Sequence, residues 1–387
     1  MGGVVKMTRC LIPWTNIDIA PLGKISPCCK FESNSYNKEF NIVDNTVDDY
    51  LQSDMLKNVK EEMLNGEWPK GCERCKIEEE NNIKSKRQLD YIRWKDEYEN
   101  YNESKGFITA SIAFGNTCNL KCITCGPSAS SRWRKEHLDL YGIDVPPVET
   151  LVDENIKNLY EHMPNIIHLD IPGGEPFLSE VEKQKKLLKT YIDNNQSKNI
   201  SIHYTTNAQV FPNDEWWDLW SHFKEIDMQL SIDGTGDRYE YIRYPAKWSL
   251  LCENVKKFVS REKVLDNVRL SVSHTVSAYN IYYLSDFFDW CGQIGLPTPW
   301  CGRVHTPLHM RPSIFPNSIK RKIIDHLQTS KHKEMISWIS LLKNSDDSQY
   351  YKVFCDMRDK HDLYRNLDYK KIFPELSRLI NEQDKEH

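Results

Sequence analysis

Short runs of alternating apolar and polar residues recur along the middle of the chain, and segments with helical spacing lie between these runs. The runs have the period of two that is typical of strands, and they are 107–114, 166–171, 200–205, 226–232, 268–276 and about 300–304. The helical segments lie near 128–140, 152–162, 179–193, 214–222, 248–261 and 280–293. Such alternation predicts parallel strands joined by crossover helices. Six units favour an α/β fold with a partial (β/α)6 barrel over the complete barrel of eight.

The two ends of the chain have other patterns. Residues 1–100 contain short mixed segments and a charged helical stretch near 48–64, and the polar run 100–105 reads as a linker. After Pro316 the spacing is helical and charged, without a strand pattern. We therefore predict three parts, which are a small cysteine-rich domain over 1–100, the partial barrel over 106–305 and a helical C-terminal extension over 306–387.

Composition narrows the classes of function. Hydrophobic residues make up 39% and charged residues 28% of the chain, which is typical of a soluble globular protein. The net charge is −5, so no basic excess indicates nucleic-acid binding, and we expect none. No apolar run approaches the roughly 20 residues of a membrane span, and the first residues lack the apolar segment of a secretion signal. We expect a cytoplasmic protein without a membrane partner.

Cysteine is the most informative residue type. The chain has 12 cysteines and no secretion signal, which favours thiolate ligands over disulfides. Cys118, Cys122 and Cys125 have the spacing C-x3-C-x2-C and follow the first barrel strand, where barrel active sites lie. Three such thiolates can bind three irons of a 4Fe-4S cubane and leave the fourth iron open to a ligand. By spacing alone, a zinc site or three buried thiols fit equally well.

A second motif, Gly173-Gly174-Glu175-Pro176, ends the second predicted strand, where two glycines let a ligand approach the backbone closely. The two motifs in this order resemble the radical S-adenosylmethionine (SAM) superfamily, whose members place C-x3-C-x2-C after strand one and Gly-Gly-Glu after strand two. The resemblance implies that SAM chelates the open iron, with Gly173, Gly174 and Glu175 near its amino group. It also implies that an electron from the reduced cluster splits SAM into methionine and a 5′-deoxyadenosyl radical.

Later strand ends carry polar residues at positions similar to the family's SAM contacts. They are Thr206 and Asn207 after strand three, Ser231 and Asp233 after strand four, Arg243 beyond them, and Ser273 on strand five. The resemblance implies contacts to ribose and methionine, with Ser273 bordering the adenine, and a guanidinium suits a carboxylate. From the residues alone, ordinary polar turns and a surface ion pair are equally good explanations. No residue stands out as a catalytic acid, base or nucleophile.

The N-terminal domain contains a separate group of four cysteines, Cys10, Cys28, Cys72 and Cys75. Four thiolates in two pairs fit a structural zinc site or a fully ligated 4Fe-4S cluster. The run C-x12-G-x4-C through Gly23 and the later C-x2-C resemble the auxiliary-cluster domain called twitch or SPASM. In familiar members that domain follows the barrel, whereas here it precedes it. The resemblance implies an auxiliary 4Fe-4S cluster that relays electrons or anchors substrate, and Cys29 is an alternative ligand to Cys28.

The family resemblance implies a radical SAM enzyme of the oxidoreductase or maturase type that removes hydrogen from a substrate C–H bond. Relatives with auxiliary domains often act on peptides or proteins, so we expect a peptide or protein substrate first and a small metabolite second. An electron donor such as flavodoxin or ferredoxin would reduce the cluster. A non-catalytic zinc-binding interaction protein is the alternative from another class.

Overall fold

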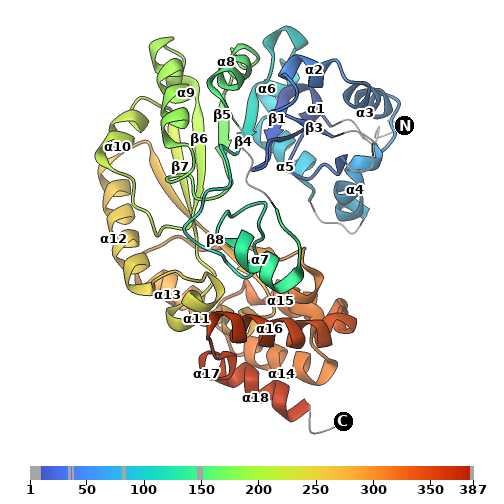
Figure 1. The fold of residues 1–387 in the computed structure, drawn as a ribbon, viewed down its shortest axis with the longest axis vertical. Coiled ribbons are helices and arrows are strands. Elements are labelled where there is room, and N and C mark those ends of the chain that lie inside the picture. Colours follow the sequence, from blue (N-terminus) through green and yellow to red (C-terminus); the bar gives the residue numbers. More distant parts are fainter. Residues whose placement is uncertain (1–9, 34–35, 37–38, 81–83, 146–150, 384–387) are drawn as a thin grey trace. The chain divides into compact units, whose positions relative to one another are not determined.

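A computed structural model of the chain describes residues 10–33, 36, 39–80, 84–145 and 151–383 (Figure 1). These residues form two compact units. The first unit comprises 1–117, 146–204 and 212–226, and the second comprises 118–145, 205–211 and 227–387. The chain therefore passes between the units several times, and strands of the predicted barrel occur in both.

The first unit is built on strands of mixed direction. They are β1 (Asn16–Ile19), β2 (Lys24–Ser26), β3 (Phe40–Asn41), β4 (Thr109–Ile112), β5 (His168–Ile171) and β6 (Ser201–Thr206), and their order is β3-β2-β1-β4-β5-β6. β1 pairs in parallel with β4, and β4, β5 and β6 continue in parallel. β2 and β3 are antiparallel to their neighbours. The cysteine-rich N-terminal segment thus adds its first strand directly to the first barrel strand, a pairing that the sequence did not predict.

The helices of the first unit lie before β4, between β4 and β6, and after β6. They are α1 (Ile12–Thr15), α2 (Val47–Leu51), α3 (Asp54–Leu64), α4 (Glu73–Glu80), α5 (Lys86–Arg93), α6 (Lys95–Glu99), α8 (Asp153–Glu161), α9 (Val181–Asp193) and α10 (Asp214–Trp220). Local capping explains several starts. The side chains of Thr46, Ser53 and Ser85 accept hydrogen bonds from the backbone of the first turns of α2, α3 and α5.

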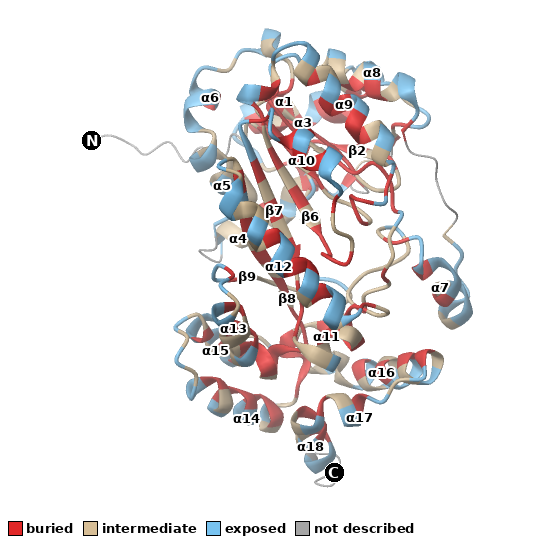
Figure 2. Cartoon of the chain, turned by 90° about the vertical axis from the view of Figure 1, so that its left-hand side faces the viewer, coloured by how far each residue is buried: buried red, intermediate tan, exposed pale blue. Residues whose placement is uncertain are grey.

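The core of the first unit lies on one face of its sheet. Residues along β6 alternate between partly exposed and buried positions (Figure 2), and Ile202 and Tyr204 are fully buried. An aromatic cluster covers this face, because Tyr204 lies 5.3 Å from Trp220 and 5.6 Å from Phe177 between ring centroids. The tryptophans of α10 therefore belong to the core.

The second unit contains the later barrel strands, β7 (Glu225–Ser231), β8 (Val268–Val276) and β9 (Trp300–Arg303), in the order β7-β8-β9. Its helices are α7 (Trp133–Tyr141), α11 (Gly236–Ile242), α12 (Trp248–Val264), α13 (Leu284–Gln293), α14 (Asn317–Gln328), α15 (Met335–Asn344), α16 (Tyr351–Arg365), α17 (Tyr369–Ile372) and α18 (Pro374–Gln383). Short 3₁₀ turns along the chain occupy Lys70–Cys72, Glu103–Lys105, Ser197–Asn199, Ile281–Tyr283, Leu308–Met310, Pro312–Ile314 and Ser348–Tyr350. The six strand–helix units occur where the sequence predicted them, and the described residues after Pro316 form helices without a strand.

The C-terminal extension is fixed to the second unit by aromatic and polar contacts. Tyr241 of α11 lies 5.1 Å from Phe373 between ring centroids, and its hydroxyl donates a hydrogen bond to Asp362 at 2.9 Å. The fold class predicted from the sequence, an α/β partial barrel with a cysteine-rich N-terminal domain and a helical tail, is confirmed. Within the part of the chain that the structure describes, no helix has the length and apolarity needed to cross a membrane.

Candidate functional site

The loop that contains Cys118, Cys122 and Cys125 is held by backbone hydrogen bonds on both sides. The backbone N–H groups of Lys121 and Ile123 donate to the carbonyls of Tyr244 and Ile242, each at 2.7 Å. Leu120 and Ile123 are buried beneath the loop at 2% and 1% exposure. The apolar positions between the cysteines therefore anchor the loop and leave its three thiols partly exposed.

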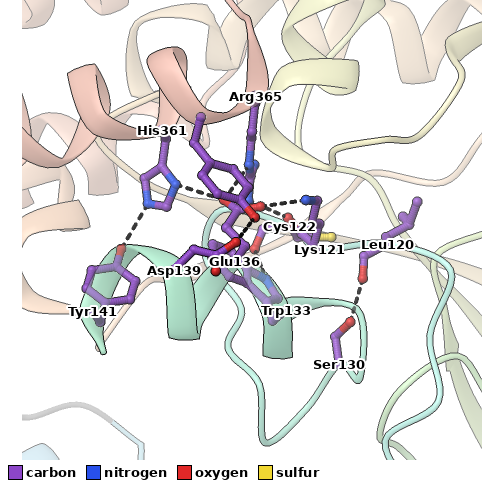
Figure 3. A network of polar contacts seen from close by, with 11 residues as sticks. Leu120, Lys121, Cys122, Ser130, Trp133, Glu136, Asp139, Tyr141, His361 and Arg365 are labelled. Atoms are coloured by element: carbon purple, nitrogen blue, oxygen red, sulfur yellow. Dashed lines mark hydrogen bonds and ion pairs between the residues drawn. The ribbon is translucent and has the colours of Figure 1, made fainter. Parts of the chain in front are cut away.

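Two further side chains hold the same loop from α7 and the turn before it. The indole Nε1 of Trp133 donates to the Cys122 carbonyl at 3.0 Å, and the Ser130 hydroxyl donates to the Leu120 carbonyl at 2.5 Å (Figure 3). The acceptor of one bond is the carbonyl of Cys122, and that of the other is the carbonyl of Leu120, which lies between Cys118 and Cys122. Because a buried loop carbonyl without a partner would cost free energy, these bonds stabilise the backbone of the loop around Cys122.

The three thiols lie near one another and near one cation. Burial raises the pKa of the Cys122 thiol to about 12, the Arg243 guanidinium opposes this rise, and Cys125 and Cys118 add to it. In the described ranges, no three His, Cys, Asp or Glu side chains are arranged to hold a metal ion. The fit to a 4Fe-4S cluster therefore rests on donor chemistry, because three soft thiolates in one short loop can each bind a different iron.

Asp233 and Arg243 form a buried ion pair beside the cysteine loop. The guanidinium Nη2 of Arg243 lies 2.8 Å from Asp233 Oδ2, and the two residues are 9% and 1% exposed. Asp233 Oδ1 also accepts from the backbone N–H of Thr275 at 2.7 Å. Arg243 is thus held in place by a carboxylate of the protein itself, and its positive charge faces Cys122.

Thr206 and Asn207, at the end of β6, form a tight turn against the cysteine loop. The Asn207 amide donates to Asn119 Oδ1 at 2.8 Å and lies 3.8 Å from Cys118 Sγ. Thr206 Oγ1 accepts from the backbone N–H of Ala208 at 3.1 Å. Of the predicted SAM contacts in the second unit, Asn207 and Arg243 therefore lie next to the cysteines.

Ser231 is the last residue of β7, and Ser273 lies within the neighbouring strand β8. The backbone N–H of Ile232, next to Ser231, donates to the Ser273 carbonyl at 2.9 Å, and both serines are partly exposed. Both serines therefore lie on the partly exposed face of β7 and β8. Their contact with SAM stays a prediction.

The Gly173-Gly174-Glu175-Pro176 motif forms a turn that only glycine allows. Gly174 has a φ of +28°, and a Cβ on it would lie 2.2 Å from the carbonyl oxygen of Thr117, the residue before Cys118. The Glu175 backbone N–H donates to that same carbonyl at 2.8 Å. Glu175 is fully buried, and Oε1 of its carboxylate accepts from the Phe177 N–H at 3.4 Å. The two glycines thus let the second motif approach the residue that leads into the cysteine loop.

The four N-terminal cysteines gather in the first unit. Burial raises the pKa of Cys10, with Cys72 and Cys75 adding to the rise, and burial also raises the pKa of Cys72 next to Cys28 and Cys75. Cys29 has other neighbours. Burial raises its pKa too, but the charged groups near it are Lys86, Asp18 and Asp170. These neighbourhoods favour Cys28 over Cys29 as the fourth ligand.

A buried carboxylate connects the cysteine loop to the C-terminal extension (Figure 3). Glu136 of α7 is 1% exposed; its Oε1 accepts from Arg365 Nε at 2.8 Å and lies 3.1 Å from His361 Nδ1, while its Oε2 lies 2.6 Å from Lys121 Nζ. Arg365 also donates to the Lys121 carbonyl at 3.0 Å. We call Glu136, Lys121, His361 and Arg365 the loop clamp. Its members are up to 244 residues apart in the chain, and no local pattern could have revealed them.

Ionisation of Glu136 depends on those partners. Burial opposes its charge, but the hydrogen bond with His361, the charge of Arg365 and the hydrogen bond from Lys121 outweigh burial and lower its pKa to about 2. Glu136 is therefore ionised at neutral pH in a place where an unpaired carboxylate would be costly.

Comparison with known proteins identifies the N-terminal segment. Residues 10–76 match the family model of SPASM, an iron-sulfur cluster-binding domain, and the SPASM-like domain predicted from the sequence is thereby confirmed. This range includes all four N-terminal cysteines. No curated protein matches the chain.

Several solved structures are similar at low identity. Native anSMEcpe with bound AdoMet has a TM-score of 0.44 and 17% identity, covering 62% of each chain. The same protein with AdoMet and the Kp18Cys peptide has a TM-score of 0.41 and 18% identity, covering 56% of this chain and 57% of that one. SuiB of Streptococcus suis bound to S-adenosylmethionine has a TM-score of 0.40 and 14% identity, covering 75% of this chain and 65% of that one. The chain spans less than two thirds of the length of each.

Replacing Cys28 with Ala should remove the N-terminal cluster, because Cys28 faces Cys10 and Cys72 whereas Cys29 does not. After anaerobic reconstitution, iron analysis should show a loss of about four irons per chain. The adjacent Cys29→Ala variant is the matched control and should keep the iron content of the unaltered chain. The opposite pattern would make Cys29 the ligand.

Replacing Glu136 with Gln should destabilise the protein by about 3 kcal/mol at pH 7, because Arg365 and Lys121 would lose their buried counter-charge. The folded pKa of Glu136, about 2, is below its ordinary value of 4.5. Its stabilising contribution is therefore complete above pH 4.5 and is lost as the pH falls toward 2. Urea denaturation of the cluster-free chain at several pH values measures this, since acid destroys iron-sulfur clusters.

Asp325→Asn on an exposed position of α14 is the control for that experiment, and it should change the free energy of unfolding by less than about 0.5 kcal/mol. A Glu136→Gln variant as stable as Asp325→Asn at pH 7 would show that the loop clamp contributes nothing to stability.

Proposed function

We propose that this chain, whose residues 10–76 match the iron-sulfur cluster-binding SPASM domain, is a radical SAM enzyme with SAM and 4Fe-4S clusters as cofactors, and that Cys118, Cys122 and Cys125 bind the cluster at which SAM is cleaved. The observation that carries the proposal is the position of Cys122 beside Cys118, Cys125 and the guanidinium of Arg243. Three thiolates in one loop, with the guanidinium of Arg243 beside them, suit an electron-rich cluster that needs charge compensation.

The chemistry supplied by the cofactors is that of the family. When bound, a reduced 4Fe-4S cluster held by Cys118, Cys122 and Cys125 would supply the electron for reductive cleavage of SAM, and SAM would supply the radical chemistry that removes hydrogen from a C–H bond of the substrate. The protein binds, orients and shields these groups. Its own contribution can be assigned to particular residues.

Arg243 and Asn207 act on the cysteine sulfurs. The Arg243 charge, fixed by Asp233 at 2.8 Å, favours the thiolate forms of the neighbouring cysteines. The Asn207 amide lies 3.8 Å from Cys118 Sγ and offers a hydrogen bond to it. Hydrogen bonds and charges near cluster sulfurs set the reduction potential, so both residues tune how readily the cluster is reduced.

The glycine motif and the strand-end residues form the proposed SAM-binding set. Gly173 and Gly174 leave the backbone bare where a side chain would collide, and Glu175 is held in the same turn. Pro176 completes the motif. Ser231 and Thr206 offer hydroxyl groups for the ribose and the methionine part of SAM, and Ser273 borders the adenine.

The SPASM domain is proposed to hold an auxiliary 4Fe-4S cluster on Cys10, Cys28, Cys72 and Cys75. Four protein thiolates leave no iron open, which favours electron transfer over substrate binding at that cluster. An electron taken from a substrate radical could enter it. The external reductant of the SAM-cleaving cluster would be a flavodoxin or a ferredoxin.

A peptide or protein is the favoured substrate. Relatives with SPASM domains often modify peptides, and anSMEcpe has been crystallised with a bound peptide. A small metabolite is the second candidate. The alternative of a zinc-binding interaction protein is less well supported, because the N-terminal cysteines lie in a segment that matches an iron-sulfur domain.

The proposal predicts that the reduced, reconstituted chain releases 5′-deoxyadenosine from SAM. Replacing Cys118, Cys122 and Cys125 together with Ala should abolish this release and lower the iron content from about eight to about four per chain. Chromatography of the reaction with dithionite and SAM, together with iron and sulfide analysis, measures both effects.

Cys252→Ala, on the partly exposed side of α12, is the control for cysteine loss and should keep the full iron content. Stoichiometric zinc without iron in the unaltered chain would contradict the enzyme proposal. Release of 5′-deoxyadenosine by the triple variant would place the chemistry elsewhere.

A further inference from the structure

A row of polar side chains crosses five strands of the first unit in one register. Asp18 of β1 pairs with Ser26 of β2 and with Ser111 of β4, Ser111 pairs with Asp170 of β5, and Asp170 pairs with His203 of β6. Register partners on neighbouring strands point to the same face of a sheet, so these side chains form a line. We call Ser26, Asp18, Ser111, Asp170 and His203 the polar row.

The opposite face of the same strands is apolar. The residues beside the polar row along each strand are fully or almost fully buried, and they are Ile17, Ile19, Ala110, Ile112, Leu169, Ile171, Ile202 and Tyr204. That face forms the core with the helices. The polar row therefore lies on the face that the core does not use, and Ser111, Asp170 and His203 keep part of their surface exposed.

A neighbouring row on the same face shows how polar side chains look when they serve structure alone. Asn16, Thr109, His168 and Ser201 are also register partners. They bond to one another in pairs, since Thr109 Oγ1 donates to Asn16 Oδ1 at 2.8 Å and His168 Nδ1 lies 2.9 Å from Ser201 Oγ. The ring of Trp94 lies 5.2 Å from that of His168. The side chains of this row therefore form hydrogen bonds with one another, and Trp94 packs against one of them, His168.

The polar row differs because one of its carboxylate oxygens has no hydrogen-bond donor among the described residues. Asp170 Oδ1 is buried and accepts no hydrogen bond from any described residue. Asp18 is 6% exposed and accepts hydrogen bonds from the hydroxyls of Ser26, at 3.3 Å, and Ser111. Burial raises the pKa of Asp18 to about 6, and the charge of Asp170 adds to the rise although Ser111 opposes it. Burial also raises the pKa of Asp170.

The described basic side chains near Asp18 and Asp170 do not form ion pairs with these two carboxyl groups. Lys86 faces both carboxyl groups, but its ammonium already lies 2.8 Å from Asp90 Oδ2. Arg93 and His203 also face Asp170 and lower its pKa without offsetting burial. Asp170 thus keeps one carboxylate oxygen without a hydrogen-bond donor, and among the described residues neither Asp18 nor Asp170 forms an ion pair.

We propose that the polar row binds a positively charged group of the substrate, with Asp170 and Asp18 as its counter-charges and Ser111 between them as a further acceptor. An ammonium or guanidinium group supplies the several donors that this arrangement lacks. The inference rests on the proposed function, because it names the chemical class of that enzyme's substrate as cationic. Asp18 and Asp170 are binding residues in this assignment.

The test is a ligand titration of the reconstituted chain by saturation-transfer NMR with three matched probes. The probes are the Nα-acetyl amides of lysine, norleucine and glutamate, which differ in side-chain charge. The lysine probe should bind at least about tenfold more tightly than the norleucine probe, and the glutamate probe should not bind. Asp170→Asn and Asp18→Asn should each weaken binding of the lysine probe by at least about tenfold.

Asp218→Asn, an exposed carboxylate on α10, is the control variant and should bind the lysine probe like the unaltered chain. Circular dichroism of each variant distinguishes a loss of binding from a loss of folding. Because two aspartates are replaced separately, the inference can still be tested if one of the two variants does not fold. Equal binding of the lysine and norleucine probes, or no binding of the lysine probe, would overturn the inference. SAM cleavage by the unaltered chain without substrate reports on the proposed function separately.

Discussion

The cysteine loop depends on the buried charge of Glu136. That carboxylate is ionised because Arg365, His361 and Lys121 surround it, and Lys121 lies directly before Cys122 in the chain. The same Arg365 donates to the Lys121 carbonyl. A cluster with only three protein ligands needs a loop whose thiolates are fixed before the metal binds. The helical extension supplies that rigidity from α16, more than 200 residues beyond the loop.

Strand pairing explains how the N-terminal SPASM domain joins the barrel strands. In familiar members this domain follows the barrel, so its place at the start of this chain raised the question of how it joins the rest. β1 lies parallel to β4, and Asp18 is the register partner of Ser111. The domain thus continues the sheet at its first barrel strand, and the polar row runs from the domain across the strands of the first unit.

Features that depend on neighbouring residues could be predicted from the sequence. The alternation of apolar and polar residues predicted a strand over 268–276, and β8 has the same bounds. The motifs at Cys118 and Gly173 lie after the strands expected for them. Long-range features could not be predicted. Nothing near Glu136 indicates that Arg365 will bond to it, and the polar row exists only through the register of five strands. The pairing of Arg243 with Asp233 is likewise a product of folding, whereas the sequence alone left Arg243 as either a ligand contact or an ion pair.

The central claim is that SAM binds an open iron of the cluster held by Cys118, Cys122 and Cys125. Electron-nuclear double resonance of the reduced chain, with SAM labelled by ¹⁵N at its amino group and by ¹⁷O at its carboxylate, tests it most directly. We expect hyperfine coupling of both labels to the cluster spin, because both groups would bind the iron. Absence of coupling from either label at saturating SAM would contradict the account.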